Sequence, residues 1–165
     1  MNNYRLILCF AILIACFSTK GIAQKKGEFS IGNIEVQFIR TGVEGTALFK
    51  VFSYGKNYDR ALENAKPNAV KAVIFKGIPG SDISRPMVNE YELSTSQRQF
   101  FEDFFNNGNF LNYVSISGDG SVDPSDVLRI KRNQYKVGVV VSVQKAALRK
   151  YLEETGIVKA LDAGF

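Results

Sequence analysis

The strongest structural signal in the chain is a run of alternating residues between positions 135 and 143. Apolar or aromatic side chains occupy every second position of this run: Tyr135, Val137, Val139, Val141 and Val143. Because successive side chains of a strand point to opposite faces, the run predicts a strand with one apolar face. A shorter alternating run precedes it, with a turn at Arg132 to Gln134, so residues 127–143 predict a β-hairpin.

A second hairpin is predicted near the start of the chain. Ile34, Val36 and Phe38 alternate with other side chains, and another alternating run extends from Thr46 to Tyr54. The five residues 41–45, which include two glycines, separate the runs, as in a hairpin turn. Residues 110–117 are also typical of a strand.

Three segments have helical patterns. Residues 57–75 place small side chains at every fourth position, with Pro67 inside the pattern, so we expect a kink or break near Lys66. A second helix begins with a capping box at Ser94 to Gln97 and ends near Asn106. A third spans about 144–155. The element order predicts one α+β domain, with a mostly antiparallel sheet and about three helices on one face.

Residues 1–23 have the pattern of an export signal. Arg5 precedes an uncharged run from Leu6 to Phe17, whose 12 residues are too few for a membrane span, which needs roughly 20. Gly21 and Ala23 supply the small-x-small motif of a signal-peptidase site. Cleavage there leaves a single domain over 24–165, in the periplasm or outside the cell.

The same leader is compatible with lipidation. Leu13-Ile14-Ala15-Cys16 resembles a lipobox, in which the leader ends at residue 15 and Cys16 carries the lipid. The protein would then be an outer-membrane lipoprotein. Membrane association depends on Cys16 alone.

Composition excludes several classes of site. The chain has no His, and both cysteines, Cys9 and Cys16, lie in the leader. The mature domain therefore has no imidazole or thiol nucleophile and no internal disulfide. The formal net charge of +5 falls to +3 when Arg5 and Lys20 leave with the leader, which gives no indication of a nucleic-acid partner. We expect no catalytic residue, metal or cofactor.

Two surfaces are candidates for contact with a partner. The segment 77–93 is longer than the ~12–15 residues at which irregular loops become uncommon, and such loops are often functional. Its candidate residues are Ser81, Asp82 and Arg85. On the second hairpin, we expect a basic patch on the outer face, formed by Arg129, Lys131 and Lys136. A disordered connector and an ordinary solvated sheet surface are the competing interpretations.

Two other features support different functions. Asp119, Asp123 and Asp126 lie in one turn, and their carboxylates are candidates for a hydrolase or metal-dependent enzyme, although their spacing does not match an EF-hand. Four phenylalanines share one side of the second helix: Phe100, Phe101, Phe104 and Phe105. Core packing is their first interpretation, whereas an exposed stripe would support a self-assembling structural component.

Two segments carry a resemblance to known proteins. The first is LFKVFSYGK at 48–56, followed by the alanine ladder up to residue 77, and the second is YKVGVVVSV at 135–143, followed by ALRKYLEETGIVK at 147–159. Together they resemble a family of uncharacterised secreted proteins from Bacteroidetes-type bacteria. The strand and alanine ladder are also similar to the N-terminal domain of flagellar assembly protein T and related envelope lipoproteins. The resemblance implies an envelope context and a role in binding or assembly.

The leading hypothesis is therefore a non-catalytic, extracytoplasmic module that binds an envelope protein or an anionic glycan. The leader, the resemblance and the lack of a catalytic constellation all favour it. The hydrolase and self-assembly hypotheses are the alternatives. The oligomeric state and the identity of the partner stay open.

Overall fold

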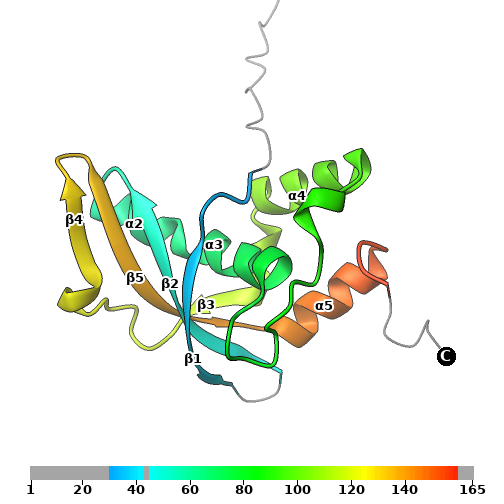
Figure 1. Ribbon diagram of the computed structural model, residues 1–165, viewed down its shortest axis with the longest axis horizontal. Coiled ribbons are helices and arrows are strands. Elements are labelled where there is room, and N and C mark those ends of the chain that lie inside the picture. The colour runs from blue at the N-terminus through cyan, green and yellow to red at the C-terminus, as the bar shows by residue number, and fades with distance from the viewer. Residues whose placement is uncertain (1–29, 43–44, 160–165) are drawn as a thin grey trace, which may run out of the picture.

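The two predicted hairpins and one further short strand join into one five-stranded antiparallel sheet (Figure 1). The computed structural model describes residues 30–42 and 45–159, so the leader, Cys9 and Cys16 lie outside the described residues. The strand order is β1-β2-β5-β3, and β4 also pairs with β5. The strands are β1 (Glu35–Thr41), β2 (Ala47–Gly55), β3 (Val114–Ile116), β4 (Val127–Lys131) and β5 (Gln134–Val143).

The strands β2 and β5 pair along their whole shared length, from Ala47 opposite Val143 to Gly55 opposite Tyr135. Alternation places the buried side chains of both strands on one face, with Phe49 opposite Val141. The second predicted hairpin, β4 with β5, and the first, β1 with β2, are both confirmed.

Both β3 and β4 pair with β5, at its two ends. β3 lies opposite Val143 to Val141 and β4 opposite Val137 to Gln134, so the two are parts of one interrupted strand with residues 117–126 between them. The prediction of a strand over 110–117 is only partly right. Residues Asn109–Tyr113 form a 3₁₀ helix, and pairing begins at Val114.

The first predicted helix is broken as expected, slightly before Lys66. It consists of α2 (Tyr58–Glu63), α3 (Ala65–Lys71) and a π turn (Ala72–Lys76), with Asn64 between the first two. Pro67 is the third residue of α3, where a backbone N–H has no partner within the helix, so the break removes most of the cost of proline. The small residues of the ladder are fully buried: Ala61, Ala65, Ala69, Ala72 and Val73.

The second predicted helix is α4 (Thr95–Asn106), and its capping box between Ser94 and Gln97 is present. Phe101 and Phe104 are buried, while Phe100 and Phe105 are half-buried. The Phe101 ring contacts Phe75 of the π turn at a centroid distance of 4.8 Å. Core packing of these phenylalanines is thus confirmed, and the exposed stripe that self-assembly would need is not formed.

The architecture is α+β, as predicted. α2 and α3 pack on the buried face of the sheet, against β2 and β5. α5 (Lys145–Glu154) follows β5 directly (Figure 1). α4 packs on α5 through the rings of Phe104 and Tyr151, whose centroids are 5.8 Å apart. No helix within the described ranges has the length and apolar character needed to cross a membrane.

The loop 77–93 is packed against the domain rather than being a connector without structure. Ile78 is fully buried, and the backbone N–H groups of Met87 and Val88 both donate to the Ile74 carbonyl, at 2.8 and 2.9 Å. A short 3₁₀ helix (Glu90–Glu92) follows before α4. The π turn thus supplies the acceptor that holds the middle of the loop.

Gly77 lets the loop lie close to the end of the π turn. Its φ of +75° is in the left-handed region that favours glycine. A Cβ at this position would lie 2.5 Å from the Ser84 carbonyl oxygen and 2.9 Å from the Arg85 carbonyl carbon. Both neighbours are backbone atoms, which cannot rotate away, so the close approach itself requires glycine.

We expect Gly77→Ala to destabilise the domain much more than Gly156→Ala. Gly156 has a φ of +71° with open space around it, so alanine there costs only left-handed strain, about 1 kcal/mol. At Gly77 the backbone clash adds to the same strain, and we expect the free energy of unfolding to fall by about 3 kcal/mol. Urea denaturation measures both, and equal losses would contradict the close approach of residues 84 and 85.

Candidate functional site

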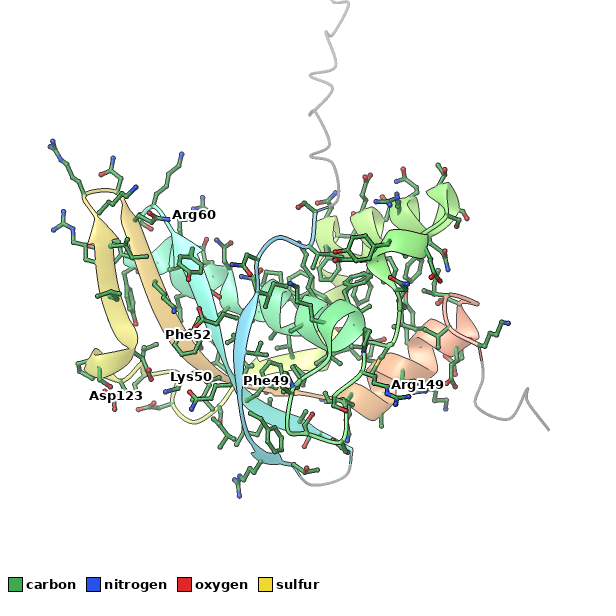
Figure 2. The ribbon with its side chains drawn as sticks, in the orientation of Figure 1. Phe49, Lys50, Phe52, Arg60, Asp123 and Arg149 are labelled. Atoms are coloured by element: carbon green, nitrogen blue, oxygen red, sulfur yellow. The ribbon has the colours of Figure 1, made fainter. Side chains whose placement is uncertain are left out.

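A groove of about 420 Å³ lies between the loop and the start of α5. The loop contributes residues 82–87, and α5 contributes Lys145, Ala146 and Arg149. α5 begins two residues after the end of β5, which fixes its first turn at the end of the sheet. Figure 2 labels Arg149 on α5, at the end of the molecule away from β4.

The groove carries more positive than negative charge. Its basic residues are Arg85, Lys145 and Arg149, and its one acidic lining residue is Asp82. Lys145 forms an ion pair with Asp82, and the Arg149 Nε donates to Glu153 Oε1 at 2.8 Å. Within the described part of the chain, Arg85 has no ion-pair partner. The lining also includes apolar side chains, among them Ile83, Pro86 and Met87.

The structure brings together two of the three loop residues that the sequence indicated. Asp82 and Arg85 line the groove, whereas Ser81 builds the loop. The Ser81 hydroxyl donates to the Ile78 carbonyl at 2.7 Å and accepts from the Ile83 N–H at 3.1 Å. Lys145 and Arg149 were not indicated, although their spacing of four residues places both on one side of the helix.

The predicted basic patch on the second hairpin is not formed as expected. Lys136 lies opposite Leu128, and Arg129 lies opposite Tyr135, whose face is the one packed on the helices. A bulge between Arg129 and Lys131 shifts the register by one residue, and a shift of one residue reverses the face of a side chain. Arg129 is therefore on the face opposite Lys136.

The positive charge of Lys136, on the outer face of the sheet, is balanced by an ion pair. The Lys136 Nζ lies 2.7 Å from Glu35 Oε2 and 4.5 Å from the centroid of the Phe52 ring. The hydrogen bond to Glu35 raises the pKa of Lys136 above its ordinary value. Lys50, labelled beside Phe52 in Figure 2, is paired in the same way with Asp126 at 2.6 Å. Four of the charges on this face thus satisfy one another.

The three carboxylates of the acidic turn have separate partners. Asp119 Oδ1 accepts the Ser121 N–H at 2.9 Å, and Asp123 Oδ1 accepts the Ser125 N–H and hydroxyl at 2.8 and 2.7 Å. Asp126 instead pairs with Lys50. Over residues 30–42 and 45–159 there is no group of three His, Cys, Asp or Glu side chains that could hold a metal ion. Through their hydrogen bonds, Asp119 and Asp123 stabilise turns, and through its ion pair Asp126 stabilises the outer sheet face.

The hydrogen bonds predict a measurable titration. The Ser125 hydroxyl and N–H lower the pKa of Asp123, and Ser121 lowers the pKa of Asp119 in the same way. Because the pKa values are depressed on folding, their stabilising effect is present above the unfolded-state pKa of about 3.9 and is lost as the pH falls through the folded-state value. In Ser125→Ala we expect the pKa of Asp123 to rise and that of Asp119 to stay unchanged. Carboxyl-detected NMR measures both, and an unchanged Asp123 would contradict the hydroxyl contact.

Comparisons with known proteins find no matching family model, no matching curated protein and no matching solved structure. The resemblance to secreted envelope proteins accordingly stays an expectation. What the groove can bind follows from the charge, shape and lining of its own residues.

Proposed function

We propose that the chain is a non-catalytic binding module of the bacterial envelope and that its groove receives an anionic group. The observation that carries the proposal is the convergence of Arg85, Lys145 and Arg149 on one cavity with a single lining carboxylate. Concave surfaces lined by one sign of charge concentrate the electrostatic field and attract ligands of the opposite sign.

The lining favours an acidic sugar over a simple anion. A uronic acid has a carboxylate, which a guanidinium group can bind through two parallel hydrogen bonds, and sugar C–H faces that pack on apolar side chains. The groove offers both features, because its lining includes Arg85 and Arg149 as well as Pro86 and Met87. An anionic glycan of the envelope therefore fits the groove better than a neutral one.

The Asp82 carboxylate competes with an anionic ligand for Lys145. This carboxylate pairs with Lys145, whose side chain is only 13% exposed, while the Asp82 side chain is 50% exposed. A ligand carboxylate that reaches Lys145 must share or replace this partner. Removing the Asp82 charge should therefore strengthen ligand binding, whereas removing the Lys145 charge should weaken it.

We expect Asp82→Asn and Lys145→Gln to change the affinity for an oligogalacturonate in opposite directions. The Asn variant should bind about threefold more tightly and the Gln variant about threefold to tenfold more weakly, since partly exposed charge pairs contribute about 0.2–1 kcal/mol and more when they are less exposed. Isothermal titration calorimetry at low salt measures both.

The matched control is Lys150→Gln, on the same helix. The Lys150 side chain is 77% exposed and lies outside the groove lining. It removes the same charge and should leave the affinity close to that of the natural chain. Equal weakening by Lys145→Gln and Lys150→Gln, or equal binding of an uncharged oligosaccharide, would contradict the proposed site.

The location of the protein is a separate prediction. We expect expression in a Gram-negative host to give a soluble protein that begins at Gln24, because the small-x-small motif ends at Ala23. Intact mass and cell fractionation measure this, with Cys16→Ser as the control. A membrane-bound species that loses its lipid mass in Cys16→Ser would replace simple secretion with lipidation, and an unprocessed cytoplasmic protein would contradict export.

A further inference from the structure

The strand β4 forms one margin of the sheet (Figure 1). One of its edges pairs with β5, and no described strand pairs with the other. A strand at the margin of a sheet presents backbone N–H and C=O groups that can pair with an added strand. The margin at β4 is therefore a potential site for strand addition.

The side chains of β4 are unusual for a protected margin. Four of its five residues are exposed, and two of these are large and apolar: Leu128 at 58% and Ile130 at 41%. Charged side chains commonly protect sheet margins from pairing, and Arg129 and Lys131 are of this kind. The side chains of Leu128 and Ile130, however, leave apolar surface exposed beside the free edge, where a partner strand could contact it.

The positive charge of this margin favours an acidic partner. Three of the four residues 129–132, at the end of the strand and in its turn, are basic: Arg129, Lys131 and Arg132. None of the three has an ion pair with another described residue. The Arg129 guanidinium donates instead to the Arg132 carbonyl at 3.2 Å and lies 5.9 Å from the centroid of the Tyr135 ring.

A second copy of the chain is a poor occupant. Antiparallel pairing of two β4 strands would bring the basic residues of one near those of the other, and like charges across strands are destabilising. An acidic strand gains from the same charges. Apolar residues between its acidic ones would cover Leu128 and Ile130.

We infer that the free edge of β4 binds an extended acidic segment of a partner protein. The segment carries acidic and apolar residues on both of its faces, because the bulge places Arg129 and Lys131 on opposite faces of β4. The backbone of the segment pairs with β4, its carboxylates lie near Arg129, Lys131 and Arg132, and its apolar side chains contact Leu128 and Ile130. This surface is distinct from the groove beside α5 and takes a protein rather than a glycan.

The experiment uses a peptide of about eight residues, typical for a strand, in which pairs of glutamates alternate with pairs of valines, so that each face of the extended peptide carries both residue types. NMR titration of the ¹⁵N-labelled mature chain should give chemical-shift changes centred on residues 127–132 and slower hydrogen exchange of amides in β4. The charge-reversal variant Lys131→Glu should weaken binding by at least about fivefold, while Lys150→Glu, which makes the same change on α5, should have little effect.

Two control peptides separate strand addition from charge alone. A lysine–valine peptide should not bind, and the glutamate–valine peptide with alternate backbone nitrogens methylated should bind more weakly, because it keeps the charge and loses backbone donors. Equal binding of the methylated peptide, shift changes away from β4, or no shift at about 1 mM peptide would overturn the inference. Concentration-dependent self-association with protection of β4 would overturn it in favour of a second copy.

Discussion

The inner faces of β2 and β5 form the platform on which the other elements are placed. Phe49 and Val51 on β2 and Val139 and Val141 on β5 are almost completely buried, and each such side chain contributes about 1.5–3 kcal/mol through removal from water. The alanine ladder of α2 and α3 lets the helix backbone approach this platform closely. Large side chains on the strands thus pack against small side chains on the helices, and this packing forms the core without disulfides.

The groove is a consequence of how the covering helix ends. α3 continues into a π turn, and the Ile74 carbonyl is left to accept two N–H groups from the loop, those of Met87 and Val88. Gly77 then allows residues 84 and 85 to return against the turn. These contacts hold the loop beside the first turn of α5, whose position is in turn set by β5. The geometry of the candidate site therefore derives from backbone contacts of the core.

Local periodicity was sufficient to predict the hairpins, and single residues with strong local preferences were sufficient to predict the capping box at Ser94 and the helix break near Pro67. Neither was sufficient for the surfaces, for two physical reasons. A bulge adds one residue without a clear sequence signal, and it moved Arg129 to the face opposite Lys136. The ion pair of Asp82 with Lys145 joins residues 63 positions apart, a proximity that only the tertiary fold creates. Residues 82 and 85 could be indicated as loop residues, but their basic partners on α5 could not.

The two proposed surfaces lie at opposite ends of β5. β4 pairs with its first residues, and α5 begins just after its last, so the stretch of β5 from Tyr135, opposite Arg129, to Val143 separates the acidic-peptide edge from the groove. At about 3.3 Å per residue this distance is roughly 25 Å, well beyond the range of direct contact and about three times the Debye length of about 8 Å at physiological ionic strength. β5 is paired on both edges and buried on one face, so it offers no hinge between them. Occupancy of one surface should therefore leave the other open, which would let a single domain of this size connect a protein strand to an anionic glycan.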